Sequence, residues 1–426
     1  KDWASLRDLT ETLYREAKAE QLIAEKFQVD GRPMGTGGGN HITLGADRPV
    51  DSPFLRRPKL LQSMLAFWQR HPSRSYLFAG LFVGATSQAP RADETRFENL
   101  YEMEIAFQQL PKSDDSASRL WLVDRLLRNL LVEVEGNTHR AEFCIDKLYP
   151  PDVGGRRLGL VELRAFEMPP HARMYMAGML FIRALVARFW QSDYHHPLAR
   201  WGPDLLDRFM LPYFLIRDFE EVLDDLRRSG YDLSMEFFAP FLEFRFPVYG
   251  ESRVGDVLLE LRMALEPWPV LGETPVGAAV SRPVDSAVER LQVRLEGLAP
   301  DRFALLCNGR RVPLHATPKR GEYVAGVRFK AWNPPNTLHP SIRAQTPLVF
   351  DLVDLRAKRS VGGCTYHVSH PGGRAYDGRP VNAAEAESRR TSRFERGGHT
   401  PGPLKEIPPV EENPEYPYTL DLRRKA

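Results

Sequence analysis

Two charged pairs stand on neighbouring apolar segments in the middle of the chain. Arg140 and Glu142 are two residues apart, and so are Glu162 and Arg164. Because side chains two apart on a strand point to the same face, each pair is predicted to share a sheet face. The carboxylates suit Mg²⁺ or Mn²⁺, and the guanidinium groups suit a phosphate or carboxylate. The pattern predicts a binding face; an ordinary salt bridge across the sheet is the alternative.

A glycine-rich segment, GTGGGNH at residues 35–41, leads into a short expected strand at 41–44. Glycines let backbone N–H groups approach an anion closely. The spacing matches neither the P-loop nor the dinucleotide fingerprint. A flexible turn with an incidental histidine is the alternative. The candidate ligands are Gly37, Gly38, Gly39, Asn40 and His41.

Two further segments carry residues with possible chemistry. Arg91 lies in the polar segment 87–94, where an arginine can neutralise a transferring phosphoryl group or simply be solvated. The segment 362–373 combines Cys364 with His367, which suggests a thiol nucleophile. The strand-and-turn context favours a structural turn there.

Composition is that of an ordinary globular protein. The 426 residues are 42% hydrophobic and 27% charged with a formal net charge of +2, so no global charge favours nucleic acid. The longest apolar run, at 76–85, is too short to span a membrane. Three cysteines without a C-x-x-C pair indicate a reducing, cytoplasmic location. The chain starts at Lys1 without a signal-peptide pattern, and we expect it to begin inside a larger protein.

The apolar patterns predict an α+β protein. The expected helices are 1–27, 51–70, 120–131, 171–190 and 204–229, and residues 75–83 fit a helix or a strand equally well. From residue 237 the chain changes to short β-type runs. The expected strands are 242–248, 257–263, 287–295, 303–308, 323–329 and 348–355. Asn308-Gly309 predicts a hairpin turn between two of the runs.

These runs predict a β-rich, sandwich-like domain at residues 236–377, after a mixed domain at 1–235. The last segment, 378–426, is poor in large apolar residues and is expected to be extended or partly disordered.

Several long strings together resemble one family, the bacterial amidoligases often fused behind a transglutaminase-like domain. The resemblance covers most of the chain and implies the C-terminal part of such a protein. The strings are DSPFLRRP (51–58), SYLFAGLFVGATSQAPR (75–91), NTHRAE (137–142), VELRAFEMPPHARM (161–174), RFMLP (208–212), EFRFP (243–247) and GGCTYHV (362–368).

The resemblance implies a glutamine-synthetase-like fold, in which the concave face of a curved antiparallel sheet binds divalent metals and ATP. Such enzymes convert a carboxylate into an acyl phosphate, which an amine then attacks. The implied metal ligands are His41, Glu142 and Glu162, with Mg²⁺ or Mn²⁺ as the ion. The implied catalytic residues are Arg91, Arg140 and Arg164. The implied nucleotide-binding residues are Gly37, Gly38, Gly39, Asn40 and His41.

The resemblance also implies small-molecule or peptide carboxylate and amine substrates, an upstream transglutaminase-like region in the same protein, and no nucleic-acid or membrane partner. The superfamily places an acidic metal-binding strand before the first helix, whereas this chain starts at that helix. We therefore expect that strand to be missing and the site to be incomplete. The alternative function is a noncatalytic segment that binds a peptide at the edge of the β-rich domain.

Overall fold

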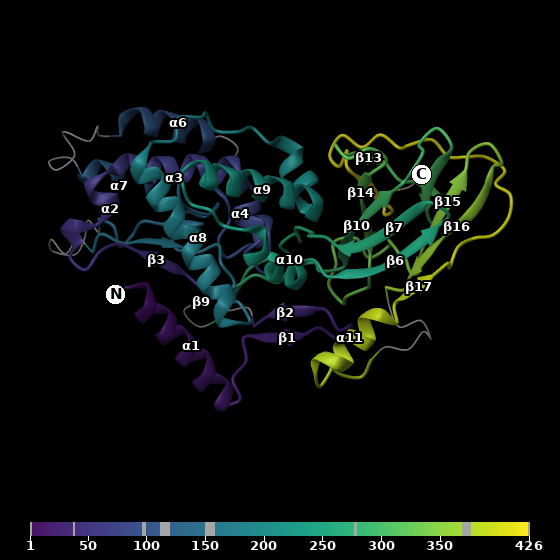
Figure 1. Ribbon diagram of the computed structural model, residues 1–426, viewed down its shortest axis with the longest axis horizontal. Coiled ribbons are helices and arrows are strands. Elements are labelled where there is room, and N and C mark those ends of the chain that lie inside the picture. The colour runs from purple at the N-terminus through teal and green to yellow at the C-terminus, as the bar shows by residue number, and fades with distance from the viewer. Residues whose placement is uncertain are drawn as a thin grey trace. The chain divides into compact units, whose positions relative to one another are not determined.

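The computed structural model describes residues 2–36, 39–95, 99–110, 120–149, 158–276, 279–368 and 376–424. The chain forms two compact units (Figure 1). Unit 1 comprises residues 1–26, 35–200 and 216–241, and unit 2 comprises residues 27–34, 201–215 and 242–426. Helices and antiparallel sheets are both present, so the fold is α+β, as predicted. No helix in the described ranges is long and apolar enough to cross a membrane.

Unit 1 is mainly helical. Its helices are α1 (Trp3–Ala19), α2 (Pro53–Arg56), α3 (Pro58–Arg70), α4 (Ser73–Tyr76), α5 (Ala92–Thr95), α6 (Asn99–Gln109), α7 (Leu120–Leu127), α8 (Ala172–Gln191) and most of α9 (Pro212–Arg228), with the 3₁₀ turns η1 (Pro49–Asp51) and η2 (Gly84–Thr86). Asp2 caps α1 by accepting a hydrogen bond from Ser5 N at 2.8 Å. His171 caps α8 in the same way, through Nδ1 and Arg173 N.

A small antiparallel sheet of order β3-β5-β4 lies in unit 1. Its strands are β3 (Ile42–Leu44), β5 (Val161–Leu163) and β4 (Phe143–Cys144). Ile42 and Phe143 both pair with Leu163, and all three side chains are buried. Trp68 of α3 packs against Phe143 with the ring centroids 5.2 Å apart. The apolar face of the sheet therefore faces the helical core, and the opposite face carries Thr43, Glu162 and Cys144.

Aromatic rings fill much of the core of unit 1. Phe78 contacts Phe166 at 5.1 Å, Phe181 at 5.7 Å and Phe241 at 5.0 Å between centroids. Residues 77–83 follow α4 as irregular backbone, which answers the helix-or-strand ambiguity of this apolar run. Glu167 N donates to Phe78 O at 2.8 Å, so residues 77–83 are hydrogen-bonded to the chain that follows β5.

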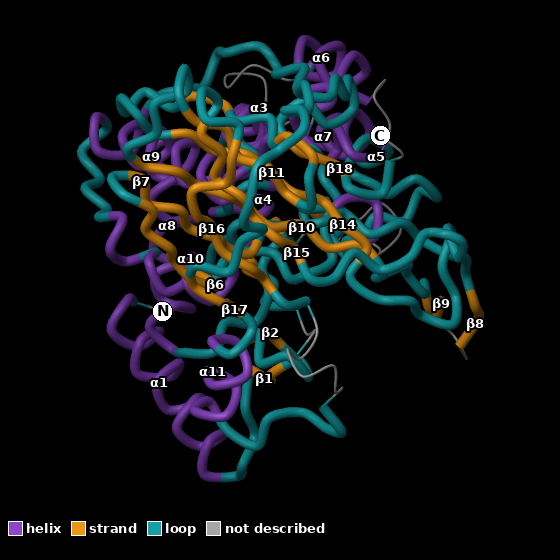
Figure 2. The backbone as a smooth tube through the Cα atoms, turned by 90° about the vertical axis from the view of Figure 1, so that its right-hand side faces the viewer, coloured by secondary structure: helices purple, strands orange, loops and turns teal. Residues whose placement is uncertain are grey.

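Unit 2 contains two larger sheets. The first has the order β13 (His315–Ala316), β14 (Tyr323–Lys330), β10 (Val288–Glu296), β7 (Val257–Met263), β6 (Val248–Val254), with β18 (Thr419–Asp421) parallel to β14. The second has the order β12 (Arg310–Arg311), β11 (Phe303–Cys307), β15 (Leu348–Asp354), β16 (Arg359–Tyr366), β17 (Phe394–Arg396). A separate hairpin, β8 (Thr274–Val276) and β9 (Ala279–Ser281), extends away from these sheets (Figure 2). A further short ladder pairs β1 (Glu25–Phe27) with β2 (Pro33–Gly35).

Five of the six strands expected after residue 237 are present. Asn308 and Gly309 both have positive φ, 47° and 78°, as the predicted hairpin turn requires. The expected strand at 242–248 is wrong over most of its length, because Ala239–Arg245 forms α10. Phe238, Phe241, Leu242 and Arg245 are buried at spacings of three and four, which is helical periodicity in a run too short to reveal it.

Four expected helices also differ from the structure. The helix expected at 51–70 is divided into α2 and α3 by the non-helical backbone of Arg57, and the helix expected at 120–131 ends at Leu127. The helix expected at 1–27 ends at Ala19, and Gln21 has a φ of 60°, which breaks the helix before β1. The helix expected at 204–229 is divided into η4 (Gly202–Leu205), η5 (Arg208–Met210) and α9. Pro212 is the first residue of α9. A helix continuing from residue 204 would need a backbone N–H at position 212, and proline has none.

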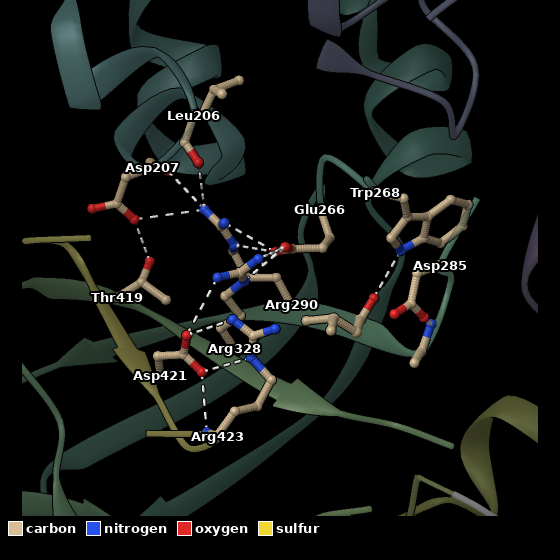
Figure 3. A network of polar contacts seen from close by, with 12 residues as sticks. Leu206, Asp207, Glu266, Trp268, Asp285, Arg290, Arg328, Thr419, Asp421 and Arg423 are labelled. Carbon is tan, nitrogen blue, oxygen red and sulfur yellow. Dashed lines mark hydrogen bonds and ion pairs between the residues drawn. The ribbon is translucent and has the colours of Figure 1, made fainter. Parts of the chain in front are cut away.

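A buried ionic network joins distant segments within unit 2 (Figure 3). Glu266 accepts from both Arg290 at 2.9 Å and Arg328 at 2.6 Å. Arg328 also pairs with Asp421 at 3.3 Å, and Arg290 with Asp207 at 3.5 Å. These contacts fix β18 and the segment 201–215 to the first sheet.

The last segment is only partly extended. It contains α11 (Ala383–Thr391), whose N-cap Asn382 accepts from Glu385 N at 2.9 Å, and the strands β17 and β18. Residues 369–373, at the end of the 362–373 motif, lie outside the described residues.

Candidate functional site

Glu162 is the centre of a polar cluster on the β3-β5-β4 sheet, on the face opposite the helical core; its own side chain is buried, and His41 and Lys147 beside it are partly exposed. Its Oε1 contacts His41 Nδ1 at 2.8 Å and Arg164 Nη1 at 2.9 Å, and its Oε2 contacts Lys147 Nζ at 3.3 Å. We call His41, Lys147, Glu162 and Arg164 the Glu162 cluster. It brings together three of the residues expected to carry chemistry and adds Lys147.

Strand alternation places these side chains. Val161 and Leu163 are fully buried, so Glu162 between them and Arg164 after them point to the other face. His41 directly precedes β3, beside Gly39. A Cβ at position 39 would lie 2.4 Å from His41 Nε2, so glycine is required for the ring to occupy this place.

The charges of the cluster set its protonation states. Burial raises the pKa of Glu162, but the cations of Arg164 and Lys147 outweigh burial and hold that pKa below its usual range. Burial and Arg164 together lower the pKa of His41 despite the nearby carboxylate. The imidazole is therefore neutral at pH 7, donates through Nδ1 to Glu162 and keeps a lone pair on Nε2.

The cluster has two cations and one carboxylate. Arg164 Nε is buried and forms no hydrogen bond with any described residue, while 17% of the Arg164 side chain remains exposed. Arginine next to lysine, with an unused buried donor, is suited to a phosphate or a carboxylate. A divalent cation fits less well, because both oxygens of Glu162 already hold cationic or N–H partners.

Glu142 belongs to a second, buried cluster. Its carboxyl group interacts with Arg91 and Ser75, and Oε1 has no hydrogen-bond partner in the described parts of the chain. Burial, opposed in part by the charge of Arg91, raises the pKa of Glu142 to about 7. A cavity of about 20 Å³ beside Glu142 and Arg91 has room for roughly one water molecule.

Arg91 lies in the interior, with 1% of its surface exposed. Its guanidinium pairs with both oxygens of Asp93 at 2.9 Å, donates to Ser75 Oγ at 2.9 Å and donates to Gln69 O at 2.7 Å. All three guanidinium nitrogens are thus engaged within the protein. This arrangement favours a role for Arg91 in building the site rather than in touching a ligand.

Arg140 is directed away from both clusters. Its guanidinium contacts Glu133 at 3.0 Å and Ser87 O at 3.1 Å. Residues 140–142 precede β4 and are not part of the strand. The expectation that side chains two residues apart share a sheet face therefore does not apply to them. The backbone still connects the segments, because Arg164 N donates to Glu142 O at 2.9 Å.

The glycine-rich segment is described only in part. Gly37 and Gly38 lie outside the described residues. Asn40 is half-buried, and its N–H donates to Phe166 O at 2.8 Å, which aligns the segment with the chain beyond β5. Cys364 is fully buried in β16, so the structural reading of the 362–368 motif fits the geometry better than a thiol nucleophile does.

Sequence reasoning gave little weight to Lys147 and none to Ser75 or Asp93. Lys147 stands fifteen residues before Glu162, with a Pro- and Gly-rich sequence between them, and no local pattern connects the two. Ser75 lies in an apolar run, where its hydroxyl gave no signal. Asp93 was the only one with a sequence clue, since it is two residues from Arg91.

The fold and the site define an α+β protein with a charged sheet face suited to anions. The model of the family described as "Putative amidoligase enzyme (DUF2126)" matches residues 1–423. The chain therefore belongs to this amidoligase family. Neither the curated proteins nor the solved structures include a match to the chain.

Proposed function

We propose that the protein is an ATP-dependent carboxylate–amine ligase whose reacting groups meet at the Glu162 cluster. The observation that carries the proposal is that Arg164, which has an unpaired buried Nε, lies next to partly exposed Lys147 and a neutral, partly exposed His41 around one carboxylate. Membership in the amidoligase family gives the reaction class.

In the proposed first step, a substrate carboxylate oxygen attacks the γ-phosphorus of ATP. A new P–O bond forms, the bond from the γ-phosphorus to the bridging oxygen breaks, and ADP leaves. Arg164 and Lys147 stabilise the negative charge on the transferring phosphoryl group and fix the carboxylate. ATP enters as its usual Mg²⁺ complex, and no step is assigned to an ion held by the protein.

In the second step, the amine nitrogen attacks the carbonyl carbon of the acyl phosphate. The C–N bond forms, the C–O bond to phosphate breaks and phosphate leaves. The amine must lose a proton, and His41 Nε2 is the base that the geometry supplies. Glu162 orients this ring through Nδ1 and stabilises the imidazolium after proton transfer.

Calorimetric titration with MgATP tests the binding part of the proposal. We expect Arg164→Ala to weaken binding at least about tenfold, since a hydrogen bond to a charged group contributes roughly 1.5–3 kcal/mol. The matched control is Arg200→Ala, because Arg200 is also in unit 1 and pairs with Glu104 at 2.9 Å away from the cluster. Equal affinity in the wild type and Arg164→Ala would contradict the assignment, and no binding to the wild type would favour the noncatalytic alternative.

His41→Asn tests the proposed base. With a pool of amino acids as carboxylates and an alkylamine as acceptor, we expect amide formation to fall roughly 10²–10⁴-fold. Hydroxylamine is unprotonated at pH 7, so hydroxamate formation should fall much less. Equal losses with both nucleophiles would show that His41 does not act as the base.

A further inference from the structure

A third cluster of chemically distinct side chains lies beside the Glu162 cluster. His139, Cys144 and Asp146 each offer one donor atom, and all three atoms lie within 4.8 Å of one another. Cys144 Sγ is 3.9 Å from His139 Nδ1, and His139 Nε2 is 3.6 Å from Asp146 Oδ2. One thiol, one imidazole and one carboxylate thus lie within reach of one another.

The carboxylate of this cluster is held in place by neighbouring side chains. Arg128 Nη1 contacts Asp146 Oδ1 at 2.8 Å, and Thr138 Oγ1 donates to Asp146 Oδ2 at 2.7 Å. Arg128 is itself fixed by Asp124 at 2.6 Å. Hydrogen bonds of this kind orient carboxylate ligands in metal sites. The lone pair of Oδ2 that Thr138 does not use remains open to an ion.

Accessibility distinguishes a metal site from a catalytic thiol. Cys144 is buried in β4, with 1% of its surface exposed, so a substrate cannot reach its sulfur. The His139 side chain is 62% exposed and borders solvent, which gives a small ion an entry path. A buried sulfur beneath an exposed imidazole and a fixed carboxylate suits an ion that lies at the surface.

We propose that His139, Cys144 and Asp146 bind one transition-metal ion, with zinc as the best chemical match. Zn²⁺ accepts sulfur, nitrogen and oxygen ligands together, whereas Mg²⁺ and Ca²⁺ require oxygen alone. Three protein ligands leave a fourth tetrahedral position for water.

The proposed ion has a structural consequence for the Glu162 cluster. Cys144 is the register partner of Glu162 across the β4–β5 ladder. Lys147 follows Asp146 directly and reaches Glu162 Oε2. An ion bound to Cys144 and Asp146 therefore fixes the segment that brings Lys147 to the Glu162 cluster.

Cobalt titration of the chelator-treated full chain tests the proposal, because Co²⁺ occupies zinc sites and absorbs strongly when a thiolate binds it. We expect one equivalent of Co²⁺ to produce the thiolate-to-cobalt band and Zn²⁺ to abolish it. Cys144→Ser should remove the band, whereas Cys307→Ser, in unit 2, should keep it. No band in the wild type, or a band that persists in Cys144→Ser, would overturn the proposal.

Exposed His139 provides a variant that does not disturb the core. We expect His139→Ala to weaken Co²⁺ binding at least about tenfold. Removing a residue that only orients a metal ligand already weakens metal binding by roughly 10–100-fold, and His139 is a proposed ligand itself. The matched control is His195→Ala, since His195 is also exposed in unit 1. Thr138→Val should weaken binding about tenfold while the band remains. Unchanged affinity in His139→Ala would refute the assignment whether or not the protein binds ATP.

Discussion

Glu142 makes the stability of the protein depend on pH in a direction opposite to that of most carboxylates. Burial raises its pKa from 4.5 to about 7. The folded state therefore keeps a proton that the unfolded state loses, and stability falls as the pH rises from about 4.5 to about 7. Each unit of pKa shift corresponds to roughly 1.4 kcal/mol, so the cost above pH 7 is about 3 kcal/mol.

Glu142→Gln removes this cost, because the amide has nearly the same size and carries no charge. We expect the variant to match the wild type most closely at pH 4 and to be more stable by up to about 3 kcal/mol at pH 8. Urea unfolding followed by circular dichroism between pH 4 and pH 8 measures the difference. The control is Glu104→Gln, whose exposed pair with Arg200 contributes less than about 1 kcal/mol.

Two results would refute this reasoning. One is a Glu142→Gln variant that is less stable than the wild type at pH 8. The other is a stability difference that does not change with pH. If the variant is more stable but makes no amide, the carboxyl is kept for function at the expense of stability.

Three other substitutions have defined outcomes. Glu162→Gln should lower the free energy of unfolding by about 2 kcal/mol at pH 7. Because the pKa of Glu162 is lowered in the folded state, its contribution is lost as the pH falls through this pKa, and the difference from the wild type should vanish in acid. A difference that grows in acid would contradict this. Asp421→Asn should cost about 2 kcal/mol through the weakened contact with Arg328, measured by calorimetric unfolding, and an unchanged melting temperature would exclude it. Arg91→Lys should cost about 2–4 kcal/mol, since lysine cannot hold both oxygens of Asp93 and the backbone carbonyls at once; full stability in urea would show that these bonds are dispensable.

The sequence predicts the side-chain directions in the site where they follow from the alternation of side chains along a strand. Val161 and Leu163 are buried and Glu162 pairs with Arg164, because a strand with period two determines all four directions. Arg140 and Glu142 have the same spacing, but they lie in the turn before β4, where the rule does not apply.

Long-range contacts account for what the sequence does not predict. The interior position of Arg91 depends on carbonyl groups of α3, more than twenty residues away, so a solvated loop arginine and a buried one look alike in the sequence. In unit 2 the alternating strands were predictable. The return of residues 27–34 and of β18 to that unit depends on pairings across hundreds of residues, such as Arg32 with Glu289 at 2.6 Å.

The network around Arg328 also has a consequence for synthesis. Asp421 and Thr419 complete the hydrogen bonds of Arg328 and Asp207, which are translated about one hundred and two hundred residues earlier. The contacts of unit 1 need no residue beyond 241, so unit 1 can fold while the rest of the chain is still being made. The first sheet of unit 2 can gain β18 and its buried contacts only after residue 421 has left the ribosome. During that interval the nascent chain presents open strand edges, and this is the stage at which chaperone binding would matter most for yield.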